Sequence, residues 1–299
     1  MNTLVSVIVP TYNHAHLIKK ALASLIAQTH ENWEAIVVNN FSADNTLEVI
    51  ASFGDSRIRV INFHNNGSIA ASRNVGIRDA RAEYIAFLDS DDYWYPEKLA
   101  KCLGKLQSEN ADLCVNSEMI MFNDQPVKPI PCGTKKQLTY FNLLFRGNCI
   151  STSSVLMKKS SLDQVGIFNE DPQMITAEDY DLWLRLARNK CKFVGVNEIL
   201  GGHLLHATNS SSFVEKHHNA ILKVIELYFK DFPDDYKTAL NKRIRYANLF
   251  YGTGRNATRQ KKFQDSLHFY QQALASNPFK VKTYPAAVIS LVKQIRSLA

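Results

Sequence analysis

Short apolar runs rich in β-branched residues alternate with longer helical segments over the first part of the chain. The runs LVSVIV, EAIVVN, RIRVIN and YIAFLD predict strands, and HLIKKALASLIAQ, TLEVIASF and SIAASRNVGIRDA predict the helices between them. Strands separated by helices of this length form a parallel sheet with right-handed crossovers. We therefore expect the first ~115 residues to be an α/β layer structure, with boundaries good to a few residues.

Polar loops follow each of the predicted strands. In chain order they are PTYN, NNFSAD, HNNGS and DSDD. Ligands of open α/β sheets bind beyond the carboxyl ends of the strands, where such loops meet. The sequence thus predicts one functional edge built from these segments.

The predicted secondary structure changes twice in the rest of the chain. Residues 112–205 mix predicted strands (DLCVNSEMIMF, STSSVLMKK, CKFVGV, ILGGHLLH) with an amphipathic helix in EDYDLWLRLARNK. From about residue 213 strand signals vanish, and four or so helices are expected. The segment KKFQDSLHFYQQALASNP resembles half of a tetratricopeptide repeat. We therefore predict domains at 1–212 and 213–299, the second containing one degenerate tetratricopeptide-like segment.

Composition narrows the class of protein. The 299 residues are 45% hydrophobic and 21% charged, with a net charge of +7. The five cysteines are scattered, which is typical of reduced thiols in a cytoplasmic protein. No secretory signal is recognised, and no run approaches the roughly 20 apolar residues of a membrane span. No nucleic-acid-binding motif accompanies the basic residues of the tail, so a solvated helical face or an anionic membrane surface is expected to account for them.

Asp89 and Asp91 flank Ser90 directly after the fourth predicted strand. Residues i and i+2 of an extended segment point the same way, so the two carboxylates can converge on one hard cation. Mg²⁺ or Mn²⁺ would relieve their repulsion and take further oxygens from water and phosphate. The alternative is that Asp91 and Asp92 cap a helix starting near Pro96.

These segments together resemble a known family. The run SVIVPTYNHAHLIKKALASLIAQTHENWEAIVV, then NGSIAASRNVGIRDARAEYIAFLDSDD, then AEDYDLWLRLA are similar to family 2 glycosyltransferases over roughly residues 4–206. The resemblance implies a GT-A fold, a Rossmann-like mixed α/β sheet flanked by helices, here with a C-terminal helical extension. It also implies inverting transfer of a sugar from a nucleotide diphosphate donor to an acceptor hydroxyl, assisted by Mn²⁺ or Mg²⁺.

The resemblance implies donor and metal residues position by position. Pro10, Thr11 and Tyr12 match the loop that contacts the nucleoside, and Tyr12 would stack on the base. Arg73 lies in the segment that approaches the diphosphate, although a salt bridge to a carboxylate is the alternative. Ser90 belongs to the same donor-binding set.

Three further residues are expected to hold the metal. Asp91 would be the principal ligand, with Asp89 assisting directly or through water, and His206 sits where related enzymes often carry a histidine that reaches the metal or the diphosphate. The remaining histidines His14, His16, His217 and His218 are expected to face solvent.

Asp179 matches the family's catalytic base, and Glu178 would orient it or hold the acceptor. Inversion requires a carboxylate that takes up the acceptor's proton as the new bond forms. The alternative is that both acids only favour the first turn of the following helix through its dipole.

One loop departs from the family pattern. Where Asp-Asp-Gly-Ser is usual, this chain reads Asn39-Asn40-Phe41-Ser42. An asparagine carbonyl can still accept a hydrogen bond from uracil, though without charge. Phe41 replaces a glycine that tolerates positive φ and adds an aromatic ring near the base. A UDP-sugar stays the expected donor.

Two functions remain open at this level. The first is an active hexosyl- or N-acetylhexosaminyltransferase in cell-surface polysaccharide or lipooligosaccharide synthesis, acting on a glycan or lipid-linked acceptor. It would be cytoplasmic, with peripheral contact to the inner face of the membrane through the C-terminal helices as an option. The second is a non-catalytic relative that serves as a binding or scaffolding subunit, which the asparagine replacements alone favour.

Overall fold

The computed structural model describes residues 3–205 and 213–298, which divide into two compact units. Unit 1 comprises Met1–Tyr140, Asn148–Pro172 and Glu178–His206, and unit 2 comprises Phe141–Gly147, Gln173–Ala177 and Ala207–Ala299. The domain boundary predicted between residues 212 and 213 adjoins residues 206–212, which the structure does not describe, so it stays a prediction. Unit 2 also takes in two segments from the middle of the chain.

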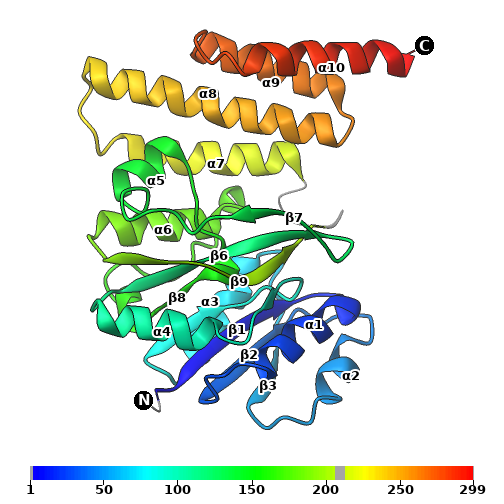
Figure 1. Cartoon of the computed structure of the whole chain (residues 1–299), viewed down its shortest axis with the longest axis vertical. Coiled ribbons are helices and arrows are strands. Elements are labelled where there is room, and N and C mark those ends of the chain that lie inside the picture. The colour runs from blue at the N-terminus through cyan, green and yellow to red at the C-terminus, as the bar shows by residue number, and fades with distance from the viewer. Residues whose placement is uncertain (1–2, 206–212, 299) are drawn as a thin grey trace. The chain divides into compact units, whose positions relative to one another are not determined.

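Unit 1 is built on a mixed sheet (Figure 1). Within the described residues its strands are β1 (Val5–Thr11), β2 (Trp33–Asn39), β3 (Ile58–Asn62), β4 (Tyr84–Phe87), β5 (Tyr93–Trp94), β6 (Leu113–Phe122), β7 (Gln125–Ile130), β8 (Leu156–Lys158) and β9 (Phe193–Leu204). Their order is β3-β2-β1-β4-β8-β6-β9-β5, with β7 paired to β6. Strands β1 to β4 are parallel, whereas β8 runs antiparallel to both β4 and β6. The predicted parallel half and the predicted mixed sheet are both confirmed.

Helices of unit 1 cover both faces of this sheet. They are α1 (Ala15–Ile26), α2 (Thr46–Ala51), α3 (Ile69–Asp79), α4 (Lys98–Ser108) and α6 (Glu178–Arg188), with short 3₁₀ turns η1 (Thr152–Ser154), η2 (Lys159–Leu162) and η3 (Pro172–Met174), the last extending into unit 2.

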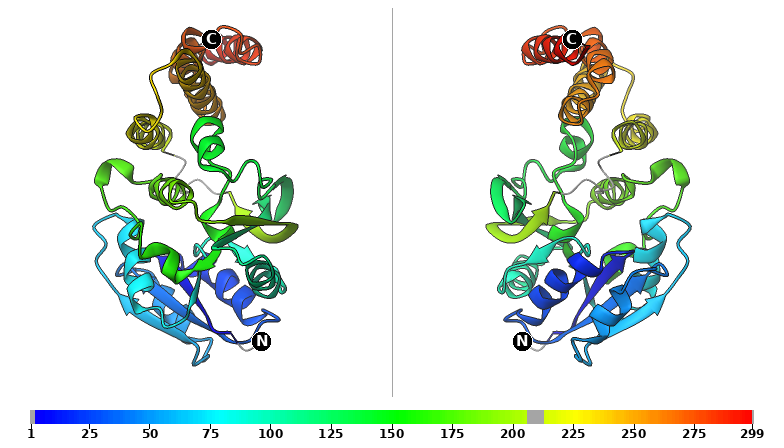
Figure 2. Two further views of the ribbon diagram at one scale, coloured as in Figure 1. Left: turned by 90° about the vertical axis from the view of Figure 1, so that its left-hand side faces the viewer. Right: turned by 90° about the vertical axis from the view of Figure 1, so that its right-hand side faces the viewer.

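Successive side chains of β1 point to opposite faces of the sheet, which explains how helices pack on both faces. Val5, Val7 and Val9 share a buried cluster with side chains of α1 and α4. Ile8 points to the other face, where α3 lies so close that a Cβ added at Gly76 would sit 2.5 Å from Ile8 Cγ2. Successive strand residues face opposite sides, so one β-branched run supplies both cores. Figure 2 shows α1 and α3 on opposite sides of β1.

The parallel strands end level with one another. The register pairs Thr11 with Asn39 and Asn39 with Asn62, each at the carboxyl end of its strand. Loops after β1, β2 and β3 therefore begin at one edge of the sheet, as the sequence predicts.

The middle of the chain departs from prediction at several points. The run STSSVLMKK is a strand only in its second half, because Thr152–Ser154 forms η1 before β8 begins. The two strands predicted in CKFVGV and ILGGHLLH are one strand, β9, whose pairing with β6 shifts register twice. The short strands β5 and β7 were not predicted. A register shift lets one long strand follow the twisted sheet without breaking.

Unit 2 consists of helices, as predicted for the tail. These are α5 (Tyr140–Arg146, from Phe141 onward), α7 (Val214–Phe229), α8 (Tyr236–Arg259), α9 (Phe263–Ser276) and α10 (Thr283–Leu298). Helices α8 and α9 pack closely, since a Cβ added at Gly254 would meet the Tyr270 ring at 2.7 Å. That a tetratricopeptide-like segment lies here stays a prediction.

Two histidines of unit 2 differ from expectation. His218 is 5% exposed and lies against Phe250 and Phe269, with its Nδ1 2.8 Å from Thr253 Oγ1. Burial lowers the pKa of His218 to about 4, so it is neutral at pH 7. His217 is partly buried and its Nδ1 lies 3.1 Å from the carbonyl oxygen of Thr176. The prediction that both face solvent was wrong.

Candidate active site

Three carboxylates follow β4 within four residues, and the fold gives them different environments. Asp89 and Asp91 are partly exposed, whereas Asp92 is 3% exposed. The Asp92 carboxylate accepts a hydrogen bond from Ser153 Oγ at 2.6 Å and faces His203 Nδ1 at 3.1 Å. Asp92 is therefore turned into the protein, which separates its charge from the other two.

His203 carries the compensating charge. Asp92 raises the pKa of His203 to about 10 against the opposing effect of burial, while burial raises the pKa of Asp92 itself. The helix-cap alternative for Asp92 is wrong, because α4 begins at Lys98 with Glu97 at its N-cap. The pair instead ties the acidic loop to β9.

The Ser90 side chain is turned into the protein. It is 3% exposed, and its Oγ lies 2.8 Å from His14 Nδ1 in the loop after β1. His14 is thus partly buried against the acidic loop, so its predicted solvent-facing position was wrong. His16 is exposed, as predicted. The contact between Ser90 and His14 connects the loops after β1 and β4.

Arg73, on α3, lies between two carboxylates that are far apart in sequence. Its Nη2 donates to Asp89 Oδ1 and its Nη1 to Glu178 Oε1, both at 2.7 Å. The side chain is 3% exposed. Burial would lower the pKa of Arg73, but the charges of Asp89 and Glu178 raise it above its usual value. Arg73 therefore links the acidic loop to the start of α6 as a permanent cation.

Asp179 stands beside this link in the first turn of α6. Its Oδ1 accepts from the amide of Tyr180 at 2.6 Å and its Oδ2 from Thr152 Oγ1 at 3.2 Å. Removal from water and the neighbouring charge of Glu178 raise the pKa of Asp179 to about 7, although Arg73 opposes them. A carboxyl group that titrates near neutral pH is suited to exchange protons at that pH.

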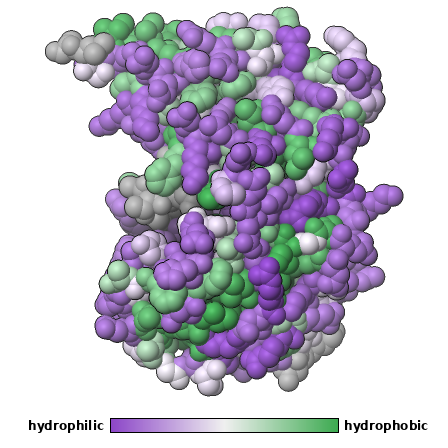
Figure 3. Space-filling model, turned by 180° about the vertical axis from the view of Figure 1, so that it is seen from behind, coloured by the Kyte–Doolittle hydropathy of each residue, from purple (hydrophilic) through white to green (hydrophobic). Residues whose placement is uncertain are grey.

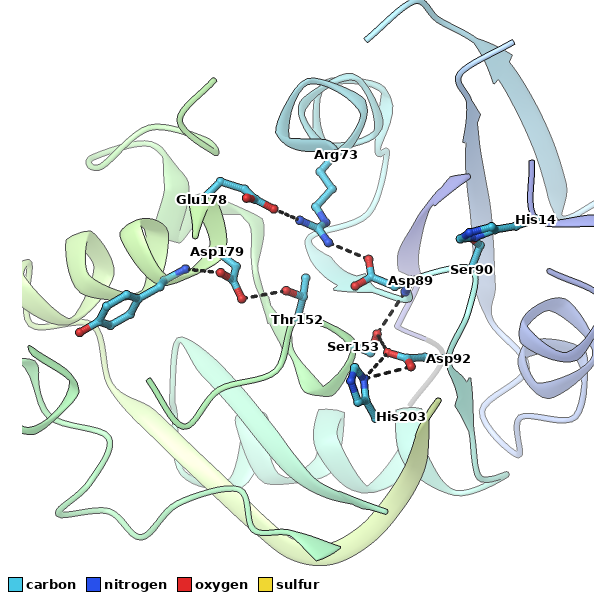
Figure 4. A network of polar contacts seen from close by, with 11 residues as sticks. His14, Arg73, Asp89, Ser90, Asp92, Thr152, Ser153, Glu178, Asp179 and His203 are labelled. Atoms are coloured by element: carbon cyan, nitrogen blue, oxygen red, sulfur yellow. Dashed lines mark hydrogen bonds and ion pairs between the residues drawn. The ribbon is translucent and has the colours of Figure 1, made fainter. Parts of the chain in front are cut away.

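Figure 4 shows how these side chains lie together. Glu178 and Asp179 come from one side, Asp89 and Ser90 from the other, with Arg73 between them. The segment carrying Thr152 and Ser153 contacts both sides, because Ser153 Oγ also accepts from the amide of Asp89 at 3.1 Å. The acidic loop and the start of α6 thus belong to one polar network.

The residues predicted to contact the nucleoside lie at the ends of β1 and β2. Tyr12 is 53% exposed, whereas Pro10 and Thr11 are buried. Thr11 Oγ1 has no hydrogen-bond partner among the described residues. Asn39 is fully buried and Asn40 is partly exposed. Buried polar atoms without partners are rare, so Thr11 Oγ1 is a candidate contact for a ligand.

The asparagines that replace the family's acids already make internal hydrogen bonds. Asn39 Nδ2 donates to Asn62 Oδ1 at 2.7 Å, and its Oδ1 accepts from Ser42 Oγ at 2.6 Å. Asn40 Oδ1 accepts from the amide of Asn65 at 3.0 Å. Both side chains hold the loops at this edge together.

The donor set at the acidic loop fits a hard divalent cation. Asp89 and Asp91 are both partly exposed, and Arg73 contacts Asp89 through Oδ1. One or two carboxylates completed by water and phosphate oxygens is the usual protein share of a Mg²⁺ or Mn²⁺ shell. Among residues 3–205 and 213–298 no group of three or more His, Cys, Asp or Glu side chains gathers in the manner of an all-protein metal site. His206, also predicted as a ligand, lies outside the described residues.

Sequence reasoning did not find Thr152, Ser153, His203 or Asp92 as members of this network. The run of hydroxyl residues STSS could have indicated the role of Thr152 and Ser153, but the sequence analysis assigned this run to a strand. Their contacts span 27 to 111 positions in sequence, so no local periodicity points to them.

The chain belongs to glycosyl transferase family 2, whose model matches residues 6–166, more than half of the 299 residues. It is 36% identical over 196 residues to an uncharacterized glycosyltransferase of Rickettsia conorii, covering 62% of this chain and 32% of that protein. It is 32% identical over 187 residues to the Escherichia coli UDP-Glc:alpha-D-GlcNAc-diphosphoundecaprenol beta-1,3-glucosyltransferase WfgD, covering 62% of this chain and 70% of that protein. The chain spans about a third of the length of the first two curated relatives it matches.

Solved structures share the fold. S. aureus TarS 1–349 in complex with UDP-GlcNAc superposes with a TM-score of 0.66 at 20% identity, covering 98% of this chain and 89% of that one. The mannosyltransferase PcManGT from Pyrobaculum calidifontis, in complex with GDP-Man and Mn²⁺, gives a TM-score of 0.61 at 16% identity, covering 99% of this chain and 80% of that one. At these identities the likeness concerns the fold alone, which is GT-A-like with the C-terminal helices included.

Proposed function

We propose that the protein is a metal-dependent inverting glycosyltransferase that moves a hexosyl or N-acetylhexosaminyl group from a UDP-sugar to a hydroxyl of a glycan or lipid-linked acceptor. The pathway would be cell-surface polysaccharide or lipooligosaccharide synthesis. One observation carries the proposal. Arg73 hydrogen-bonds to Asp89 and to Glu178, so the predicted metal loop and the predicted base, Asp179, meet in one network.

Asp179 supplies the proton acceptor in this proposal. The acceptor hydroxyl oxygen attacks the anomeric carbon from the face opposite the diphosphate, a C–O bond forms, and the bond to the diphosphate oxygen breaks with its electron pair. The hydroxyl proton passes to an Asp179 carboxylate oxygen. The pKa near 7 supports this role, because the group is substantially ionised at neutral pH and still basic enough to take the proton. Glu178, paired to Arg73, orients the start of α6.

Asp91 and Asp89 would hold the divalent cation, which when bound supplies positive charge to the departing diphosphate. Arg73 donates to Asp89 Oδ1 and so holds a fixed positive charge beside that carboxylate. Ser90, through its contact with His14, fixes the backbone between the two acids. His206 remains a proposed contributor.

The names of similar proteins support a UDP-sugar as the class of donor. WfgD is named for transfer from UDP-Glc to a diphosphoundecaprenol-linked sugar, and TarS was solved with UDP-GlcNAc. The exposed ring of Tyr12 and the buried hydroxyl of Thr11, at the ends of level strands, support a nucleoside contact there. Pro10, Asn39 and Asn40 complete the proposed subsite.

Thermal shift with nucleotide sugars tests the proposal. The melting temperature is expected to rise with UDP-Glc or UDP-GlcNAc only when Mn²⁺ or Mg²⁺ is present, since a ligand stabilises by mass action when its site is complete. Asp91→Asn should remove most of the metal-dependent part of the shift. The matched control is Asp163→Asn, which changes an exposed aspartate outside the network. A full shift in EDTA, or an unchanged one in Asp91→Asn, would contradict metal dependence.

A surface of α10 supports peripheral membrane contact. Apolar side chains spaced at helical intervals lie 47–60% exposed along one stripe: Tyr284, Val288, Leu291 and Ile295. At 3.6 residues per turn, Arg296 lies to one side of this stripe and Lys293 on the opposite face of the helix. Figure 3 shows a group of hydrophobic residues at the upper left of that view, over the C-terminal helices. An apolar face beside basic residues is the pattern of a helix lying on an anionic lipid surface. Among the described residues, no helix has both the length and the apolar character needed to cross a bilayer.

Liposome co-sedimentation tests that contact. The protein is expected to pellet with vesicles containing phosphatidylglycerol and much less with phosphatidylcholine alone, and salt should weaken binding because the basic residues contribute. Val288→Ser with Ile295→Ser should reduce binding severalfold. Val127→Ser, at an exposed valine of β7, is the control. Pelleting that ignores anionic lipid would count against this part of the proposal.

A further inference from the structure

An exposed aromatic ring follows the carboxyl end of each of β1, β2 and β3, at the edge of the sheet where the nucleotide donor is proposed to bind. Backbone hydrogen bonds continue past the strands, from the amide of Asn40 to the carbonyl of Thr11 and from the amide of Phe63 to the carbonyl of Asn39. The loops therefore leave the sheet side by side. The rings that follow are Tyr12, Phe41 and His64.

Phe41 and His64 form a stacked pair. Their ring centroids are 4.0 Å apart and their planes differ by 17°. Phe41 is 49% exposed and His64 is also exposed, so the pair keeps a large apolar and aromatic surface in contact with solvent. A hydrophobic ring held this way at a ligand edge has the form of a binding surface.

The backbone at Phe41 is held in an unfavourable conformation. Its φ is 50°, in the left-handed region that a residue with a large side chain rarely adopts. Such conformations persist where the surroundings impose them, and they concentrate at functional sites. The ring of Phe41 is thus placed at this edge in spite of a local cost that glycine would not have.

Hydrogen bonds impose that conformation on the loop. Asn39 Oδ1 accepts from both the amide and the hydroxyl of Ser42, and Ser42 Oγ accepts from the amide of Asn13. Asn40 Oδ1 accepts from the amide of Asn65, which draws the loop of His64 towards that of Phe41. Because the side chains of Asn39 and Asn40 make these internal hydrogen bonds, they have fewer donors and acceptors left for a nucleobase.

We infer that the Phe41–His64 pair is a stacking platform for the nucleobase of the donor. The inference rests on the proposed function and extends it. In this chain the base is held mainly through its ring face by Phe41, backed by His64, with less reliance on hydrogen bonds to its edge. Stacking tolerates different bases, because every base has a π-face. The platform therefore binds UDP and CDP with affinities closer to each other than a carboxylate reading the uracil edge would give.

Calorimetric titration of variants with UDP, CDP and inorganic pyrophosphate, each with Mn²⁺, tests the platform. Phe41→Gly is expected to weaken UDP and CDP binding about tenfold or more while leaving pyrophosphate binding unchanged. His64→Ala should produce a smaller loss in the same pattern. The melting temperature of Phe41→Gly should not fall, because glycine adopts positive φ without strain. Lys190→Gly, at an exposed residue with φ of 62° after α6, relieves a similar backbone strain elsewhere and should leave all three affinities unchanged.

The outcomes separate the platform from the proposed function. UDP affinity unchanged in Phe41→Gly would overturn the platform and leave the proposed function standing. An equal loss of pyrophosphate affinity would also overturn it, since the loop would then act through the phosphate side. Wild-type protein that binds no nucleotide would overturn the proposed function and the platform with it.

Discussion

Arg73→Met is expected to lower the free energy of unfolding by about 3–5 kcal/mol. The substitution leaves Asp89 and the buried Glu178 without their shared counter-charge. A buried carboxylate that loses its counter-charge is strongly destabilising. Urea unfolding followed by circular dichroism measures the effect.

Two further variants isolate the cause. Arg78→Met makes the same change on an exposed residue of the same helix, and should alter stability by less than about 0.5 kcal/mol. The double variant Arg73→Met/Glu178→Gln removes the buried carboxylate as well and should regain part of the loss. If Arg73→Met matched Arg78→Met in stability, Arg73 would not be the buried link between the acidic loop and α6.

Asp179→Asn is expected to reduce turnover by about 10²–10⁴-fold, the range that general-base catalysis contributes. The amide fits the same position, because its oxygen can accept from the Tyr180 amide while its nitrogen donates to the Thr152 hydroxyl, which is able to accept. Loss of activity would then reflect loss of the base and not of local structure. Asp163→Asn, in an exposed turn, should keep full activity.

The pH dependence of the wild-type rate follows from the raised pKa of Asp179. The base must be ionised to accept a proton, so kcat/KM should rise with pH and level off above about 7. Below that value it should fall about tenfold for each pH unit, as the ionised fraction does. The residual activity of Asp179→Asn should lack this step. A wild-type profile that is flat between pH 5 and 7 would argue against Asp179 as the base.

Local sequence patterns predict much of the fold. The β-branched runs of β1 to β4 each carry both faces of the sheet, and the helices between them leave room only for parallel pairing. The helical tail was equally clear, because strand signals end before α7. Two-residue β5 and the solvent-exposed β7 carry no usable periodicity, so they were found only in the structure.

The sequence names candidate residues of the site, whose catalytic and binding roles stay predictions, but it does not give the contacts between them. Asp89, Arg73 and Glu178 were identified in their family positions, yet the salt bridge that was the alternative for Arg73 joins residues 105 positions apart. Which carboxylate of Asp89, Asp91 and Asp92 turns inward depends on Ser153 and His203, contributed by distant elements. Such choices are made by tertiary packing, which sequence spacing does not record.

The most direct test of the account compares turnover and UDP affinity in Asp179→Asn and wild-type protein, with Mn²⁺ present. We predict that turnover falls by at least about 10²-fold while the Kd for UDP stays within about twofold, because the base acts on the acceptor and not on the nucleotide. Full turnover in Asp179→Asn would contradict the account. So would wild-type protein that binds UDP but transfers no sugar to any hydroxyl acceptor, since that result would favour a binding subunit.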